Sequence, residues 1–251
     1  MYRPTHTPIV DDYFSKPQAR PLPASFVVMA WNVQKNDFSE HAGAHISDLL
    51  SVDQVDILAL QEAVAQSQQS RFFQARYYMA PNLQKGGRHF GVVTASDYAM
   101  QPLTQCLTRS RELGWVTHKP ALITRHLLLN GQWLTHLNIH AINFVANRVF
   151  KQELQRIWRH LSEVSGPMIL SGDFNSWNKT RAQALKTATA QLGLTPVYFS
   201  QNAAIRRLNR QPLDHVFYRG LTVQQAEVLS MPHLSDHNPI WVRFALAESK
   251  H

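Results

Sequence analysis

Short apolar runs that are almost continuous constrain the fold of this chain more than any other feature. Strands are predicted at residues 26–33, 121–129 and 133–139, and the apolar runs are clearest at residues 27–31, 57–60 and 167–170, each followed by polar or turn-forming residues. Runs of this length without polar alternation are typical of strands that are covered on both faces. Many such strands among few helices predict two packed sheets with helices outside.

The remaining segments complete the expected order of elements. Strands are predicted at residues 56–60, 90–95, 98–107, 167–171, 213–218, 221–230 and 239–245, and the apolar run 229–234 also reads as buried strand. Helices are predicted at residues 40–50, 66–75, 146–165 and about 180–192. Gly166-Pro167 ends the third helix, and Asn130-Gly131 predicts a two-residue hairpin turn.

Length and composition favour a single domain. The chain has 251 residues and a hydrophobic share of 44%, and layered β-rich folds of roughly 200–250 residues are often single domains. Residues 1–23 hold five of the 13 prolines and show no clear period, which predicts an extended arm. The expected organisation is therefore an arm over residues 1–23 and one domain over residues 24–251.

Charge and cysteine content narrow the partners and the compartment. The net charge of +8 favours polyanions, namely nucleic acid, phospholipid head groups or soluble phosphates, without choosing among them. One cysteine, Cys106, allows no internal disulfide and fits a reducing cytoplasm. No apolar segment approaches the ~18 residues of a membrane helix, so we expect no membrane insertion. Together with the cysteine content, this favours a cytoplasmic protein. No obligate protein partner is expected.

Polar side chains recur where the predicted strands end or begin. They are Asn32, Glu62, His140, Asp173, Asn175, Asp214, Asp236 and His237. Any one of them alone is more often a turn or a helix cap than a functional group. Asp and Asn oxygens suit Mg²⁺ or Mn²⁺, and a neighbouring histidine can move a proton near neutral pH. Together they predict a metal-dependent phosphoester hydrolase.

Six short motifs carry a family resemblance. They are Trp31-Asn32-Val33, Leu60-Gln61-Glu62, Asn138-Ile139-His140, Gly172-Asp173-Phe174-Asn175, Leu213-Asp214-His215 and Ser235-Asp236-His237-Asn238-Pro239. In this order they resemble the endonuclease/exonuclease/phosphatase superfamily, which includes DNase I-like nucleases, abasic-site endonucleases, inositol phosphatases and bacterial sphingomyelinases. The match spans about residues 26–245, and the residues in and around these motifs are most similar to those of the YafD-like branch of bacterial proteins.

The resemblance implies a DNase I-like four-layer α/β sandwich, with two mixed β-sheets face to face and helices outside, and a catalytic role for the domain. It implies that Asn32, Glu62 and Asp236 hold Mg²⁺ or Mn²⁺. It also implies a catalytic group in which Asp173 orients or deprotonates the attacking water. In this group Asn175 and His140 contact the phosphate or the leaving group. In the same group Asp214 orients His237 against the scissile phosphate.

Two features depart from better-known members of the superfamily. His215 stands where a tyrosine is common, and we expect it to pack rather than to catalyse. His140 takes the place of the tyrosine of abasic-site endonucleases, which argues against abasic specificity.

Basic and aromatic residues near the motifs are candidates for substrate binding. Arg206, Arg207 and Arg210 precede Asp214, and Trp177 follows Asn175. Trp115 is a weaker candidate, and the segment 85–89 reads better as a plain turn than as a phosphate-binding loop.

Three functions from different classes remain open. The leading hypothesis is a Mg²⁺-dependent phosphodiesterase that acts on nucleic acid. The alternatives are a phosphatase or phosphodiesterase for a small or lipid-derived phosphate, and a non-catalytic nucleic-acid-binding protein on the same fold. A zinc hydrolase is set aside, because the 13 histidines include no close ligand pair of the usual spacing.

Overall fold

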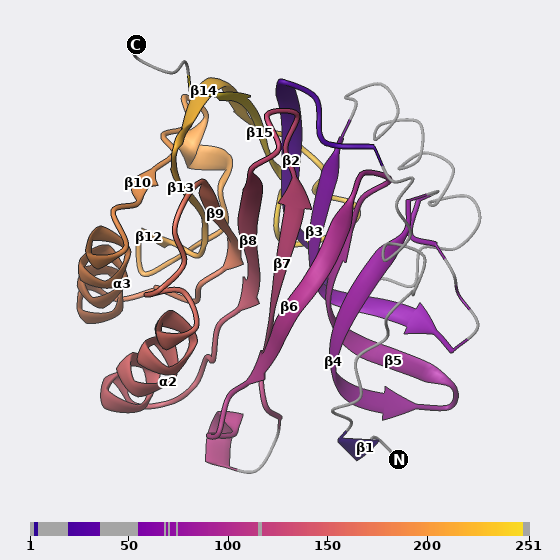
Figure 1. Ribbon diagram of the computed structural model, residues 1–251. Coiled ribbons are helices and arrows are strands. Elements are labelled where there is room, and N and C mark those ends of the chain that lie inside the picture. The colour runs from indigo at the N-terminus through magenta and orange to yellow at the C-terminus, as the bar shows by residue number, and fades with distance from the viewer. Residues whose placement is uncertain are drawn as a thin grey trace.

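Two β-sheets packed face to face form the centre of the molecule (Figure 1). The computed structural model describes residues 20–35, 55–67, 69, 71–73, 75–114 and 117–247, together with the backbone of residues 3–4. The first sheet has the strand order β1-β4-β5-β3-β2-β15-β14 and the second has the order β10-β13-β9-β8-β7-β6. The pairs β2–β3 and β8–β9 are parallel and the other pairs are antiparallel, so both sheets are mixed.

The bounds of the strands are as follows. The seven-stranded sheet consists of β1 (Arg3–Pro4), β2 (Ser25–Asn32), β3 (Ile57–Gln66), β4 (Tyr77–Lys85), β5 (Arg88–Ala95), β14 (Leu221–Val228) and β15 (Ile240–Leu246). The six-stranded sheet consists of β6 (Met100–Leu107), β7 (Pro120–Leu127), β8 (Trp133–His140), β9 (Met168–Asp173), β10 (Thr195–Pro196) and β13 (Asp214–Arg219). A separate hairpin pairs β11 (Arg207–Leu208) with β12 (Gln211–Pro212).

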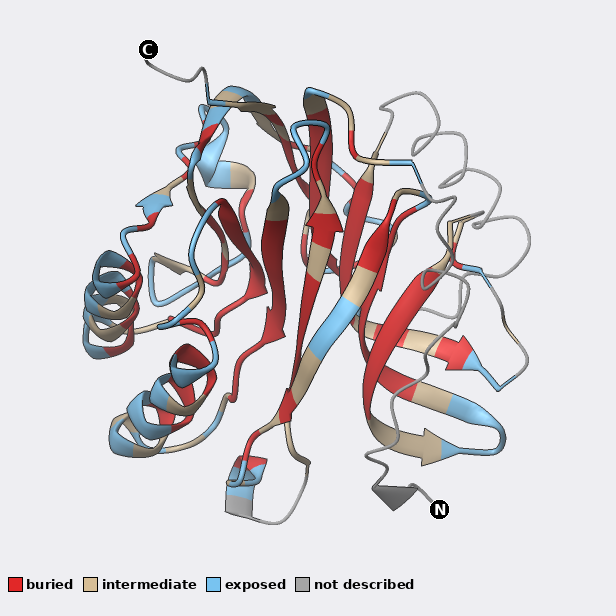
Figure 2. Ribbon diagram, in the orientation of Figure 1, coloured by how far each residue is buried: buried red, intermediate tan, exposed pale blue. Residues whose placement is uncertain are grey.

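Helices α2 (Asn147–Arg159) and α3 (Lys179–Gln191) cover the outer face of the six-stranded sheet (Figure 1). Phe150, Leu154 and Ile157 recur on one side of α2 and pack on that sheet, and the helices are buried on this side only (Figure 2). Two short 3₁₀ helices, η2 (Glu112–Gly114) and η3 (Asn202–Ala204), lie in connecting segments.

Three apolar layers hold these elements together. Val28, Ile169 and Val242 belong to the layer between the sheets, which also contains Leu134. A second layer lies between the six-stranded sheet and the helices, and a third lies on the other face of the seven-stranded sheet around Met29. Burial of each large side chain stabilises the fold by roughly 1.5–3 kcal/mol. The predicted layered α/β architecture with two packed sheets is confirmed.

Several predicted elements differ from the structure. The helix predicted at residues 66–75 is wrong, because β3 continues to Gln66 beside β5 and the chain then turns, with Phe72 bridging to Ala75. Strand β4 was not predicted, because Pro81 and a local register shift interrupt its pattern. The predicted helix at residues 40–50 and most of the arm over residues 1–23 lie outside the described residues.

Two further boundaries moved. The last predicted turn of the long helix, up to residue 165, is not helical, since α2 ends at Arg159 and the chain continues in turns with three-residue hydrogen bonds such as Val164 N to Leu161 O. The run 229–234 is a loop and not a strand. Its amides bond within the loop region, with Leu229 N donating to Pro239 O and Leu234 N to Met231 O. Within the described residues, no helix is long and apolar enough to cross a membrane.

Two fully buried histidines make the core sensitive to acid. His126 and His136 pack edge to face at 5.9 Å, and their Nε2 atoms contact Thr124 and Ser171 hydroxyls. Burial lowers the pKa of His136 from 6.5 to about 3 and that of His126 well below 6.5. The unfolded chain therefore binds more protons below pH 6.5, so stability is complete above that value and falls toward about pH 3.

We expect His136→Gln to flatten this acid dependence. Each buried histidine contributes up to about 1.4 kcal/mol of lost stability per pH unit below its unfolded pKa, and glutamine does not titrate. Urea denaturation at several pH values between about 6.5 and 5 measures the slope for both proteins. Identical slopes would contradict the assignment, and the comparison cancels carboxylates that titrate in both chains.

Candidate active site

The strand registers bring three polar residues to one edge of the six-stranded sheet. His140 ends β8 and is the parallel partner of Asp173, which ends β9. Asp214 begins β13 and is the antiparallel partner of the same Asp173. All three side chains are buried. Strand ends hold these groups rigidly, so their relative positions follow from the backbone pairing.

The seven-stranded sheet supplies two more residues opposite this edge. Asn32 ends β2, and Glu62 lies in β3 one residue beyond Gln61, the partner of Asn32. The register of β3 shifts between Leu60 and Ala63, and Glu62 has a left-handed φ of 52°. Such a bulge re-aims a side chain, and the Glu62 carboxylate keeps 21% of its side-chain surface exposed.

Asp173 lies at the centre of the contacts. Asn32 Nδ2 donates to Asp173 Oδ2 at 3.1 Å, the Asn175 backbone N–H donates to Oδ1 at 2.9 Å, and His140 Nε2 is 3.6 Å from Oδ2. Burial raises the pKa of Asp173 to about 7, and the charge of Asp214 adds to the rise. The protein thus holds a carboxyl group that changes charge near neutral pH.

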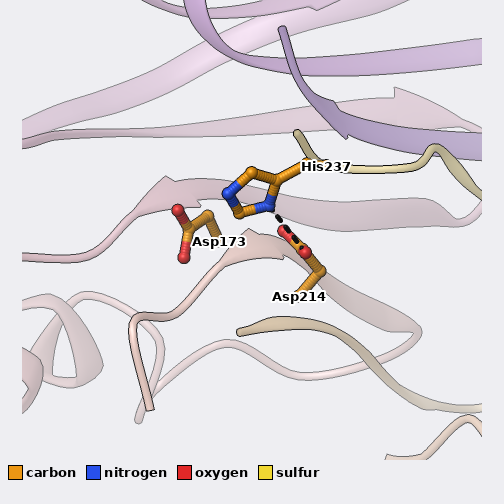
Figure 3. A group of neighbouring side chains, drawn as sticks. All are labelled: Asp173, Asp214 and His237. Carbon is orange, nitrogen blue, oxygen red and sulfur yellow. Dashed lines mark hydrogen bonds and ion pairs between the residues drawn. The ribbon is translucent and has the colours of Figure 1, made fainter. Parts of the chain in front are cut away.

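Asp214 and His237 form a hydrogen-bonded pair beside Asp173 (Figure 3). His237 Nδ1 lies 2.8 Å from Asp214 Oδ2. Burial lowers the pKa of His237, but the combined attraction of Asp214, Asp173 and Asp236 outweighs burial and raises the pKa to about 9. Burial raises the pKa of Asp214 although His237 opposes the rise. The imidazole is therefore oriented and is favoured in its protonated form.

The loop that carries His237 is fastened to β2. Trp31 Nε1 donates to the His237 carbonyl at 2.8 Å, and the Ser235 hydroxyl donates to the Asn32 carbonyl at 2.7 Å. His237 N donates to the same Ser235 oxygen. The terminal motif therefore owes its position to side-chain contacts with β2 rather than to a strand of its own.

Lys119 and Glu112 belong to the site but were not predicted. Lys119 Nζ lies 3.2 Å from His140 Nε2, 3.9 Å from Glu62 Oε1 and 3.5 Å from Glu112 Oε2, and Lys35 Nζ lies 3.7 Å from Glu62 Oε2. Burial lowers the pKa of His140 well below 6.5, and Lys119 adds to that effect. The signal was present: Lys119 precedes β7, whose start lies at the same edge as the end of its antiparallel partner β8.

The predicted substrate-binding arginines differ in their surroundings. Arg206 Nη2 lies 3.2 Å from Asp236 Oδ2, and Asp236 Oδ1 is 3.9 Å from His237 Nε2, so Arg206 borders the site. Arg207 instead donates to Arg210 O within its own exposed hairpin and to Asn202 in η3. Arg210 is exposed at the left-handed turn of that hairpin.

Other candidates have structural surroundings. Trp177 donates to Asn143 Oδ1 at 2.8 Å and stacks on the guanidinium of Arg181. His215 packs on Phe217 and contacts the Ser176 hydroxyl, as expected for a packing residue. In the segment 85–89, Gly86 and Gly87 form the turn between β4 and β5 and the other residues belong to these strands, and Trp115 lies outside the described residues.

Gly172 allows the backbone of β8 and the side chain of Gln61 from the other sheet to approach β9 closely beside Asp173. A Cβ atom at this position would lie 2.2 Å from Ile139 O and 3.1 Å from Gln61 Nε2, and the φ angle is 132°. Gln61 Nε2 in turn donates to Asn138 Oδ1 at 2.8 Å, which joins β3 to β8 across the interface between the sheets. A side chain here would displace backbone rather than a flexible group.

We expect Gly172→Ala to destabilise the protein by at least about 2 kcal/mol, measured by urea denaturation. Gly131→Ala is the matched control, since Gly131 also has a positive φ, 81°, but faces open space, and its cost should stay near about 1 kcal/mol. Equal losses in the two variants would show that the close approach at Gly172 is not limiting.

The donor set fits a hard divalent cation. Asn32, Glu62 and Asp236 offer oxygen ligands, and Asp173, Asp214 and His237 offer ligand atoms that all lie within 4.8 Å of one another. In the second set, His237 Nδ1 and Asp214 Oδ2 already bond to each other, and in the first set Asp236 and Glu62 already pair with Arg206 and Lys119. Burial raises the pKa values of both Asp173 and Asp214, and the charge of Asp214 adds to the rise at Asp173 while that of Asp236 adds to the rise at Asp214; a cation would relieve this excess of negative charge.

The chain belongs to the endonuclease/exonuclease/phosphatase family, whose sequence model matches residues 29–237. A UPF0294 protein of Vibrio campbellii is 32% identical over 237 residues, which cover 93% of this chain and 82% of that protein. A UPF0294 protein of Yersinia enterocolitica is 36% identical over 235 residues, which cover 91% and 87%. The predicted family and its YafD-like bacterial branch are confirmed.

Solved structures confirm the DNase I-like fold. The human Nocturnin catalytic domain with bound sulfate has a TM-score of 0.64 and 19% identity, and the match covers 90% of this chain and 96% of that one. D. rerio TDP2 in complex with a single-strand DNA product has a TM-score of 0.61 and 15% identity, covering 88% and 98%. The protein therefore has the phosphoesterase fold of this family, with a buried cluster of acidic residues and histidine.

Proposed function

We propose that the protein is a divalent-metal-dependent phosphodiesterase that acts on nucleic acid. The observation that carries the proposal is the buried Asp173 carboxylate, which Asn32 and the Asn175 N–H hold beside the Asp214–His237 pair. In-line hydrolysis needs a group that accepts a proton from water and cations that neutralise phosphate charge, and this arrangement supplies both.

Each residue has a proposed role. Asn32, Glu62 and Asp236 would hold Mg²⁺ or Mn²⁺, which when bound lowers the pKa of water and offsets charge on phosphate oxygens. Asp173 orients the attacking water and takes its proton. His237, oriented by Asp214, donates to a phosphate oxygen, and Asn175 contacts the same group. His140 lies beside Glu62 and Asp173 and contacts the phosphate or protonates the leaving oxygen.

Nucleic acid as substrate is supported by charge and by Arg206. The net charge is +8, and Arg206 borders the site through its ion pair with Asp236. TDP2, with the same fold, was solved with a single-strand DNA product. A guanidinium at the rim suits a flanking backbone phosphate.

One observation favours a phosphatase for a small or lipid-derived phosphate as the second candidate. A cavity of about 130 Å³ beside Glu62 and His140 is lined by Lys35 and Lys119. It is smaller than the ~300–1,000 Å³ of pockets for drug-sized ligands, so it suits a single small anionic group.

Hydrolysis assays with a substrate panel distinguish the candidates. The panel holds supercoiled plasmid, single-stranded and abasic oligonucleotides, bis-p-nitrophenyl phosphate, and inositol and sphingolipid phosphates, each with Mg²⁺ or Mn²⁺ and with EDTA. Cleavage of nucleic acid that EDTA abolishes is the expected result. Turnover of small phosphates alone would contradict the nuclease and support a phosphatase for a small or lipid-derived phosphate. Nucleic-acid binding without any turnover would favour the non-catalytic alternative.

A further inference from the structure

Arg181 is a charged residue without any exposed surface, in the first turn of α3. Its guanidinium lies between two aromatic rings, 4.5 Å from the centroid of Phe150 and 4.7 Å from that of Trp177. Burial lowers its pKa from 12.5 to about 10, so the group remains protonated at neutral pH. Burial of a charge is costly unless partners compensate for it, and here the hydrogen-bond acceptors and aromatic faces do so.

The acceptors of Arg181 are backbone carbonyls of two loops. Nη1 donates to Asn175 O at 3.1 Å and to Ile142 O at 3.3 Å, and Nη2 donates to Val145 O at 2.7 Å. Nε approaches Asn147 Oδ1 at 3.4 Å. A planar fork with five N–H donors can serve several acceptors at once, which an ammonium group on a flexible stem cannot do in the same geometry.

Both loops carry groups of the proposed site. Asn175 follows β9 and has a left-handed φ of 48°, and its Nδ2 donates to Ala141 O at 2.9 Å. Its backbone N–H donates to Asp173. Ala141 and Ile142 directly follow His140 at the end of β8. Arg181 therefore ties the loop after His140 to the loop that contains Asn175, outside the reaction centre itself.

We propose that Arg181 is a positioning residue, which fixes the backbone of Asn175 and of the loop after His140 so that Asp173, Asn175 and His140 keep their mutual geometry. The inference rests on the proposed function for its catalytic consequence. It does not rest on that function for the geometry, since the hydrogen bonds exist whatever the substrate. A displacement of about 1 Å in a reacting group can cost about 10²-fold in rate, so a small movement of Asn175 is sufficient.

A matched arginine separates positioning from general stability. Arg219 also donates to three backbone carbonyls, those of Gly166, Leu192 and Val164, but it lies at the opposite end of β13 from Asp214. Five residue steps along a strand correspond to roughly 17 Å. Arg181→Lys removes a guanidinium that bonds the loops after β8 and β9, and Arg219→Lys removes one at the far end of β13.

The test compares R181K and R219K with the wild-type protein in kcat, KM, melting temperature and backbone amide NMR. R181K is expected to lower kcat by about 10- to 100-fold with KM little changed, and to shift the amide resonances of Asn175 and Asp173. Both variants are expected to lower the melting temperature by similar amounts, but R219K is expected to leave kcat unchanged. Equal kcat in the two variants, or unshifted resonances in R181K, would overturn the inference.

Two outcomes need separate treatment. If R181K does not fold, Phe150→Leu removes one aromatic face of the guanidinium site at a distance from substrate, and a lower kcat supports the inference while an unchanged kcat overturns it. If the wild-type protein hydrolyses no phosphoester, the proposed function fails. The NMR shifts then still support or refute the positioning of Asn175 by Arg181.

Discussion

Replacing Asp173 by asparagine is expected to lower metal-dependent hydrolysis by roughly 10²–10⁴-fold, the usual contribution of a proton-transfer group. The substitution keeps the size of the side chain but removes the proton acceptor, and it replaces one of the two oxygens that accept from Asn32 Nδ2 and from the Asn175 N–H by an N–H₂ group. Initial rates with saturating Mg²⁺ and nucleic acid measure the effect.

Stability should move in the opposite direction. Because burial raises the pKa of Asp173 to about 7, the metal-free folded protein carries an unfavourable charge above that pH, and asparagine carries none. D173N is therefore expected to melt at the same or a higher temperature than wild type at about pH 8 in EDTA. Asp97→Asn, at an exposed aspartate paired with Arg71, is the control for both measurements. Near-wild-type turnover of D173N would refute the role of Asp173.

Glu62→Gln is expected to act on the metal requirement instead. Loss of the charge removes the strongest proposed ligand, and even outer-shell changes typically cost 10–100-fold in metal affinity, so the Mg²⁺ concentration for half-maximal activity should rise at least about 100-fold. Part of kcat should return at high Mg²⁺, which separates this variant from D173N. Glu163→Gln, on an exposed turn, is the control. An unchanged Mg²⁺ dependence of E62Q would remove Glu62 from the ligand set.

The strand ends explain why much of the site could be predicted from sequence. Apolar runs locate β2, β8 and β9, and a polar residue directly after each of them must lie at a sheet edge. The structure brings Asn32, His140 and Asp173 together for this reason. Asp214 can be predicted in the same way, because the start of an antiparallel strand lies at the same sheet edge as the end of its neighbour.

The rest depends on contacts between segments that are distant in sequence. Lys119 directly precedes the start of β7 and so follows the same rule as Asp214, but its position beside Glu62 depends on the packing of the two sheets. The bulge that turns Glu62 inward has no local signature, and the loop of His237 is held by Trp31, more than 200 residues earlier in the chain. Arg181 looked like an ordinary polar position of α3, because nothing in the helix pattern shows that its acceptors are loop carbonyls.

The position of β15 in its sheet determines when the site can exist. This strand comes last in sequence but pairs with β2, the first long strand, and thereby separates β2 from β14. The loop just before it brings His237 against Trp31. A polypeptide still in synthesis, with residues beyond about 235 not yet released, has neither the strand nor the histidine. The site can therefore form only after the segment of residues 235–246 has been synthesised and has paired with β2.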